Sequence, residues 1–263
     1  IHLDECGAPE MFTGGAKLVP LPGASGKLTP ETVRGVLEKT LTGDSHRVQP
    51  AALSLTQATE AGTCYRPAEI AALAEVARSR GMKLQMDGSR FANAVAHLGL
   101  APAEITWRAG VDALAFGATK NGAMGAEIVV FFDTALAESF AFRRKRAGHL
   151  FSKMRFVSAQ LEAYLAEDRW LGFARHANAM AGRIAQGLQR LPRVSLLHPV
   201  EANEVFVQLP LGVIAGLRKA GFNFYDWTDA APGTVRLVLA FDTDPAHVEA
   251  FIDTAGRLVS AAA

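Results

Sequence analysis

One lysine and one aspartate each follow an expected strand and stand in a setting suited to covalent or proton chemistry. Lys120 lies in the small-residue loop Gly117–Gly122, directly after the apolar, strand-like run Ala113–Phe116. Asp87 ends a second expected strand, Lys83–Met86. A lysine in a desolvated pocket loses its proton more easily and becomes a nucleophilic amine, which can form a Schiff base with an aldehyde cofactor. A carboxylate beside such a cofactor can keep its pyridine nitrogen protonated.

Each of these residues also has a plainer interpretation. Lys120 is an ordinary solvated residue if its loop faces water. Asp87 could cap the N-terminus of the expected helix Phe91–Leu98, or bind a metal, although no second acid or histidine lies near it in the sequence. The occurrence of both residues at strand ends favours the cofactor interpretation.

Two arginines are suited to binding the carboxylate of a substrate. The guanidinium fork of Arg90 or Arg236 matches a carboxylate bidentately. Arg236 lies in the apolar run VRLVLAF, where a charge is costly unless it is paired, or else it is an edge residue that faces water. The basic run Arg143–Arg146 is more typical of a solvated helix face, and Arg155 could reach a cofactor phosphate.

Composition argues against several other classes of protein. A net charge of +1 and an apolar content of 49% suggest neither nucleic acid nor membrane as a partner. No run approaches the roughly 18 apolar residues of a membrane span. Cys6 and Cys64 have neither metal-ligand spacing nor a disulfide framework around them, so a cytoplasmic location is expected.

Motifs for other kinds of site are missing from the sequence. The histidines show no HExxH or other metal spacing, and no metal is expected. The sequence contains no GxGxxG, no GxxxxGK[ST] and no GxSxG, which argues against a dinucleotide site, a P-loop and a serine nucleophile.

Strands and helices alternate along the first half of the chain. Expected strands are Ala51–Thr56, Lys83–Met86, Ala113–Phe116, Ile128–Phe132, Val194–Leu197, Glu204–Leu209, Phe222–Trp227 and Thr234–Leu239. Expected helices are Thr29–Leu41, Pro67–Arg80, Phe91–Leu98, Pro102–Ala109, Thr134–Gly148, Ser152–Leu191 with a break near Asp168–Trp170, Leu211–Ala220 and Pro245–Ser260. The order predicts an α/β fold with a mainly parallel sheet, in which ligands bind beyond the carboxyl ends of the strands. Asp87 and Lys120 both stand at such ends.

The pattern changes after Pro192, where shorter strands predict a smaller α+β domain. We expect a large α/β domain over residues 1–155, and a connecting helix with the small C-terminal domain over residues 156–263. The chain opens at Ile1 without a methionine and without a preceding element, so its N-terminal part is expected to be missing.

Together these residues resemble the threonine aldolase / β-eliminating lyase family. The matching segments are ECGAPE (Glu5–Glu10), FTGGAKL (Phe12–Leu18), SLTQATEAGT (Ser54–Thr63), MDGSRFANA (Met86–Ala94), FGATKNGAMGAE (Phe116–Glu127) and VEANEVFVQLP (Val200–Pro210). The pairing of MDGSR with ATKNG is specific, and the similarity covers essentially the whole chain. The branch it resembles most is that of the low-specificity L-threonine and phenylserine aldolases. The resemblance implies pyridoxal 5′-phosphate as cofactor and the aspartate-aminotransferase-like fold (fold type I).

The resemblance also implies roles for particular residues. Lys120 would form the Schiff base with the cofactor, Asp87 would hold its pyridinium proton, and Ser89 would pack on one face of its ring. Arg90 and Arg236 would bind the amino-acid carboxylate, with Arg90 also beside the cofactor. Thr119 and Arg155 are further candidates for the cofactor phosphate.

Three features of the family pattern have no counterpart here. The glycine-containing phosphate loop and a substrate-carboxylate serine belong to a region before this chain. The ring-stacking histidine falls just before Ile1, so His2 does not take that role. The loop Glu60–Arg66 lacks the histidine that relatives carry there, which leaves the group that takes the β-hydroxyl proton unassigned.

The activity that the resemblance implies is that of an aldehyde-lyase. It cleaves the Cα–Cβ bond of a β-hydroxy-α-amino acid of the L-threonine, L-allo-threonine or phenylserine type to glycine and an aldehyde. Alternatives are β-elimination, transamination, or a truncated chain with the aldolase fold and no cofactor. Members of the family that it resembles are usually homotetramers built from tight dimers, with active sites at subunit interfaces, and we expect a homodimer or homotetramer of this kind here.

Overall fold

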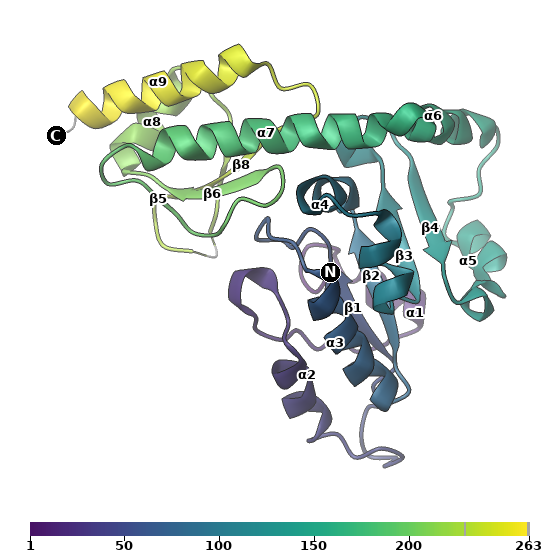
Figure 1. Ribbon diagram of the computed structural model, residues 1–263. Coiled ribbons are helices and arrows are strands. Elements are labelled where there is room, and N and C mark those ends of the chain that lie inside the picture. Colours follow the sequence, from purple (N-terminus) through teal and green to yellow (C-terminus); the bar gives the residue numbers. More distant parts are fainter. Residues whose placement is uncertain (229, 262–263) are drawn as a thin grey trace.

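A four-stranded sheet with the order β1-β2-β3-β4 lies at the centre of the N-terminal half (Figure 1). Its strands are β1 (Ala52–Thr56), β2 (Lys83–Gly88), β3 (Ala113–Gly117) and β4 (Glu127–Phe131). The first three strands are parallel to one another, and β4 runs antiparallel to β3. The structure is a computed structural model that describes residues 1–228 and 230–261. The mainly parallel sheet predicted from the sequence is confirmed.

The helices of this half match the expected positions in most cases. They are α1 (Ala8–Thr13), α2 (Pro30–Leu37), α3 (Pro67–Ser79), α4 (Phe91–Leu98) and α5 (Phe140–Arg146). Thr29 caps α2 as expected, because its hydroxyl accepts a hydrogen bond from the backbone N–H of Thr32. The short helix α1 was not expected. The segment predicted as one helix over Pro102–Ala109 forms two 3₁₀ turns, because Thr106 between them has a non-helical backbone.

The prediction of a single helix over Thr134–Gly148 is wrong. A 3₁₀ turn occupies Thr134–Ala137, and the carboxylate of Asp133 caps it by accepting a hydrogen bond from the backbone N–H of Ala135. Ser139 then has non-helical dihedral angles (φ −98°, ψ 2°), so α5 begins only after it.

A long helix connects the two halves of the chain. The helices α6 (Arg155–Leu165) and α7 (Arg169–Gln189) are separated by Glu167 and Asp168, which have positive φ angles of 55° and 54°. The expected break near Asp168 is therefore confirmed. Figure 1 shows α7 running from the β1–β4 sheet to the C-terminal elements.

The C-terminal half contains a second, antiparallel sheet with the order β5-β6-β8-β7. Its elements are β5 (Ser195–Leu196), β6 (Glu204–Gln208), α8 (Leu211–Lys219), β7 (Tyr225–Asp226), β8 (Thr234–Val238) and α9 (Pro245–Ala261). The strand expected over Phe222–Trp227 is shorter than predicted. Because β8 lies between β6 and β7, the interpretation of Arg236 as an edge residue is wrong.

Each sheet has its own hydrophobic core, and α7 contributes to both. Trp170 and Ala174, near its start, are buried with the residues around β1–β4. Met180 and Ile184, farther along, are buried with β6, β8, α8 and α9. The helix α7 thus connects the two cores. Among the described residues, no helix has the length and apolarity needed to cross a membrane.

Candidate active site

The turn that carries Lys120 is anchored by hydrogen bonds of the neighbouring residue, whereas the side chain of Lys120 has no polar partner among the described residues. Lys120 is exposed, and it makes no hydrogen bond or ion pair to any described residue. Its neighbour Asn121 is buried and donates from Nδ2 to the hydroxyl oxygen of Tyr164 (2.7 Å) and to the carbonyl oxygen of Trp170 (2.9 Å). The amine of Lys120 therefore projects from an ordered support and has no competing partner.

The hydroxyl of Thr119 helps to close the same turn. It accepts a hydrogen bond from the N–H of Ala126 (3.1 Å) and donates one to the carbonyl of that residue (3.3 Å). A phosphate contact from this hydroxyl would have to replace the second of these bonds.

Asp87 lies at the carboxyl end of β2, next to the end of β3. Its Oδ1 accepts hydrogen bonds from the N–H (2.9 Å) and hydroxyl (2.5 Å) of Ser89, and its Oδ2 has no hydrogen-bond partner among the described residues. It does not cap α4, whose N-cap is Arg90 without any side-chain cap bond, so that interpretation is wrong. A Cβ atom on Gly117 would lie 2.8 Å from the Cα of Ser89, which shows how closely the two strand ends approach. Asp87, Ser89 and the lysine turn thus share one edge of the sheet.

Arg90 and Arg236 come together around a buried carboxylate that the sequence analysis did not single out. Arg90 Nη2 lies 3.1 Å and Arg236 Nη1 lies 3.8 Å from Oε1 of Glu204. The exposed fractions of the three side chains are 10% for Arg90, 22% for Arg236 and 0% for Glu204. The guanidinium of Arg236 also lies over the rings of Trp227 (5.4 Å) and Tyr225 (5.7 Å). We call Arg90, Arg236 and Glu204 the Glu204 group.

Several buried atoms of the Glu204 group have no hydrogen-bond partner. These are Nε of both arginines and both carboxylate oxygens of Glu204, since the ion pairs lack hydrogen-bond geometry. Burial raises the pKa of Glu204, while the charges of Arg90, Arg236 and Lys120 act to lower it. Unpaired buried donors are rare in folded proteins and call for an acceptor from outside the chain.

One signal in the sequence could have identified Glu204. It begins the apolar run EVFVQL, just as Arg236 lies within VRLVLAF. An acidic residue in one apolar strand and a basic residue in another predict a buried ion pair. The sequence does not tell which acid of the segment Val200–Pro210 makes the pair.

The remaining predicted site residue, Arg155, is exposed at the start of α6. Its guanidinium stacks on the ring of Phe156 at 4.8 Å. No contact joins Arg155 to the Glu204 group or to the lysine turn among the described residues, so its role stays a prediction.

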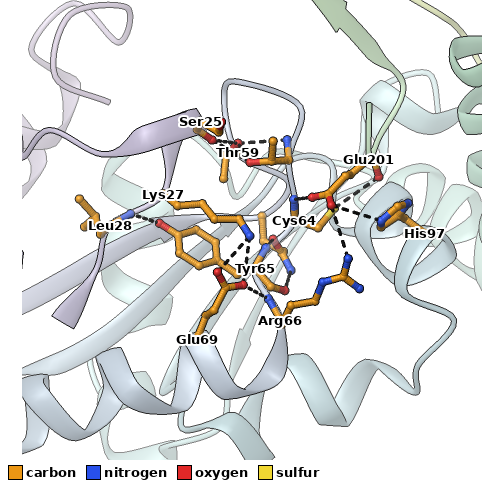
Figure 2. Close-up of polar contacts among 12 residues, drawn as sticks. Ser25, Lys27, Leu28, Thr59, Cys64, Tyr65, Arg66, Glu69, His97 and Glu201 are labelled. Carbon is orange, nitrogen blue, oxygen red and sulfur yellow. Dashed lines mark hydrogen bonds and ion pairs between the residues drawn. The ribbon is translucent and has the colours of Figure 1, made fainter. Parts of the chain in front are cut away.

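A second carboxylate, that of Glu201, lies three residues before Glu204 but in a different setting (Figure 2). Its Oε2 accepts a hydrogen bond from the backbone N–H of Cys64 (2.7 Å), and its Oε1 lies 3.4 Å from Arg66 Nη2 and 3.8 Å from His97 Nε2. We call these four residues the Glu201 cluster. Burial lowers the pKa of His97 and raises the pKa of Cys64 to about 12, so this thiol is unreactive at neutral pH. The cluster ties the C-terminal half to the loop after β1.

No group of histidine, cysteine, aspartate and glutamate side chains in the described part of the chain is arranged to hold a metal ion.

Comparison with known proteins relates this geometry to a family. Residues 1–211 match the family model described as "Beta-eliminating lyase". A protein of Pseudomonas aeruginosa named "Low specificity L-threonine aldolase" is 47% identical over 244 residues, 93% of this chain and 69% of its own length. A protein of the same name from a Pseudomonas species is 44% identical over 94% of this chain and 70% of its own length. The solved structure of a Leishmania major threonine aldolase has a TM-score of 0.90 at 28% identity and covers 98% of this chain and 74% of that chain.

Proposed function

The chain belongs to the β-eliminating lyase family, and from this premise we propose that it cleaves the Cα–Cβ bond of β-hydroxy-α-amino acids to glycine and an aldehyde. Substrates of the L-threonine, L-allo-threonine or phenylserine type fit this reaction. The observation that carries the proposal is the 47% identity, over 93% of the chain, to a low-specificity L-threonine aldolase. The free amine of Lys120, at the same sheet edge as Asp87, supports it independently.

Pyridoxal 5′-phosphate is the cofactor of this reaction, and the residues present fit it. Lys120 offers an amine with no partner, and Asp87 offers an oxygen, Oδ2, that accepts no hydrogen bond from the described residues. Ser89 lies beside Asp87 at the same sheet edge, where it can pack on the ring. When bound, the cofactor supplies an electron-accepting ring that stabilises the carbanion left by bond cleavage.

The chain's own residues bind and orient the reactants. Lys120 would hold the cofactor through its aldehyde, and Asp87 would keep a proton on the pyridine nitrogen. Arg90 and Arg236 would hold the substrate carboxylate and so fix the rotation about the bond from Cα to nitrogen, which determines the bond that breaks. Thr119 and Arg155 are the candidates on this chain for the cofactor phosphate.

We extend the proposal to the domain division, the oligomeric state and the cellular location of the protein. The division at residues 155 and 156 assigns the lysine and aspartate to the first domain and Glu204 and Arg236 to the second. Exposed apolar side chains, including Met124, Phe142 and Phe156, support a subunit interface and thus a homodimer or homotetramer. A cytoplasmic location is consistent with the free thiols of Cys6 and Cys64.

Product analysis of the purified holoenzyme tests the proposal. With L-threonine we expect glycine and acetaldehyde in equal amounts, whereas β-elimination of serine would yield pyruvate and ammonia. Borohydride reduction followed by peptide mass spectrometry should find the cofactor attached to Lys120. Lys120→Ala should lose that adduct and the visible absorbance, and Asp87→Ala should lose most turnover while it keeps the adduct. A wild-type protein without aldehyde release would contradict the proposal.

A further inference from the structure

We propose that Glu204 is a positioning residue that holds Arg90 and Arg236 in the orientation in which both meet the substrate carboxylate. The three members of the Glu204 group come from separate parts of the fold. Arg90 precedes α4 in the large sheet's half, whereas Glu204 begins β6 and Arg236 lies within β8. The carboxylate of Glu204 is the one acidic group in the described structure that forms ion pairs with both arginines.

The strand register explains why Glu204 and Arg236 meet. Arg236 lies opposite Phe206 in the antiparallel pair of β6 and β8. Side chains alternate along a strand, so Glu204 and Phe206 project from the same face, and Arg236 is the diagonal neighbour of Glu204. The guanidinium of Arg236 also lies over the rings of Tyr225 and Trp227, which limit its movement.

The surroundings of Glu204 indicate that it acts through the arginines. A fully buried carboxylate is costly unless it is paired, and the pairing here is with cations alone. Neither oxygen accepts a hydrogen bond from a backbone N–H or a hydroxyl of the described residues. A carboxylate that served only to hold the backbone would have such a bond, as Glu201 does with the N–H of Cys64.

What remains unpaired in the Glu204 group points to the ligand. The Nε atoms of Arg90 and Arg236 are buried and lack an acceptor. With Glu204 ionised, the group of three has one net positive charge, which one substrate carboxylate would neutralise. Without Glu204, the two guanidiniums would repel each other and lose their common orientation.

The inference rests on the proposed function, because it takes the α-carboxylate of an amino acid as the ligand. The test uses Glu204→Gln holoenzyme, with Glu201→Gln as the control from the same segment. Glycine and glycinamide are titrated separately, and binding is followed by the change in absorbance of the bound cofactor. Glycinamide has the same amine and lacks the carboxylate, so a general disturbance of the site weakens both ligands.

We expect Glu204→Gln to raise the dissociation constant for glycine about tenfold or more, the effect of losing one charge-assisted interaction, and to change that for glycinamide less than about twofold. KM for L-threonine should rise in parallel, with kcat changed less than about threefold. Glu201→Gln should leave both dissociation constants as in the wild type.

Several results would overturn the inference. These are unchanged or tighter glycine binding in Glu204→Gln, or equal weakening of glycine and glycinamide. If Glu204→Gln yields no folded holoenzyme, Glu204→Asp decides, since its shorter side chain cannot span to both arginines and the same criteria apply. A wild-type enzyme that binds glycine but releases no aldehyde would contradict the proposed function and leave this inference standing.

Discussion

The molecule places two carboxylates on one segment and uses them differently. The side chain of Glu201 is 18% exposed. It accepts a backbone hydrogen bond and lies within ion-pair distance of an exposed arginine and a histidine. Glu204 is fully buried, and among the described residues its ion pairs are with two arginines, with neither oxygen hydrogen-bonded. Both link the C-terminal half to the N-terminal half.

The difference shows how a structural ion pair can be told from a functional one. The oxygens of Glu201 are satisfied by the chain itself, so the cluster is complete without a ligand. The Glu204 group leaves donors unused at its centre, which is a cost in folding and a benefit when an anion arrives. We therefore expect variants of the Glu201 cluster to change stability, and variants of the Glu204 group to change substrate binding as well.

The largest expected effect comes from breaking the buried pair. Arg90→Met should lower the free energy of unfolding by about 3 kcal/mol, because it leaves Glu204 buried with only the more distant Arg236. The matched control, Arg66→Met, removes the arginine of the Glu201 cluster, which is 54% exposed, and should cost less than about 1 kcal/mol. Urea unfolding followed by circular dichroism measures both. Equal losses in the two variants would remove the distinction between the two sites.

A smaller loss is expected when Glu201 itself is removed. Glu201→Ala should lower the free energy of unfolding by about 1.5–3 kcal/mol, because the N–H of Cys64 loses a charged acceptor. kcat/KM for L-threonine should stay within about twofold of the wild type. Steady-state kinetics below the unfolding temperature checks this, and a large fall in kcat/KM with unchanged stability would reverse the assignment of roles.

The sequence predicted one side of the site and not the other. Asp87 and Lys120 each follow a strand expected from the sequence, and a parallel sheet brings the carboxyl ends of such strands to one edge. Arg236 was noticeable because it interrupts an apolar strand. Which partner neutralises it depends on the β6–β8 register and on the approach of Arg90 from the other half, neither of which has a local signal.

The same limit applies to the elements that were misplaced. The residues Thr134–Gly148 have good helix-forming composition, but the capping carboxylate of Asp133 and the conformation of Ser139 divide them. Composition over a window does not show where a side chain competes for backbone N–H groups. Element type was predictable over most of the chain, whereas the contacts between the two halves were not.

Labelling of the two cysteines would show local opening of the Glu201 cluster. Burial raises the pKa of Cys64 to about 12, so iodoacetamide at pH 8 should modify the exposed Cys6 and leave Cys64 unmodified. In Glu201→Ala, peptide mass spectrometry should find Cys64 modified more rapidly, whereas in Glu204→Gln its protection should be unchanged. Equal reactivity of Cys64 in the wild type and in Glu201→Ala would mean that the cluster does not control access to this thiol.

The smallest expected effect is a difference between the two sites in their response to pH. Burial lowers the pKa of His97 below the ordinary value of 6.5, with Glu201 opposing and Arg66 assisting the shift. The unfolded chain therefore binds a proton at a higher pH than the folded chain, and the contribution of His97 to stability falls as the pH drops below 6.5.

Glu204 behaves in the opposite sense. Burial raises its pKa above 4.5, so its contribution to stability falls as the pH rises through the raised value.

The difference in unfolding free energy between wild type and His97→Gln, measured from pH 5 to pH 8, isolates the histidine, since other titrating groups are common to both. The wild type should lose stability relative to His97→Gln on the acid side. Parallel curves would mean that protonation of His97 is not resisted in the folded state, and the Glu201 cluster would then be more open to water than its burial indicates.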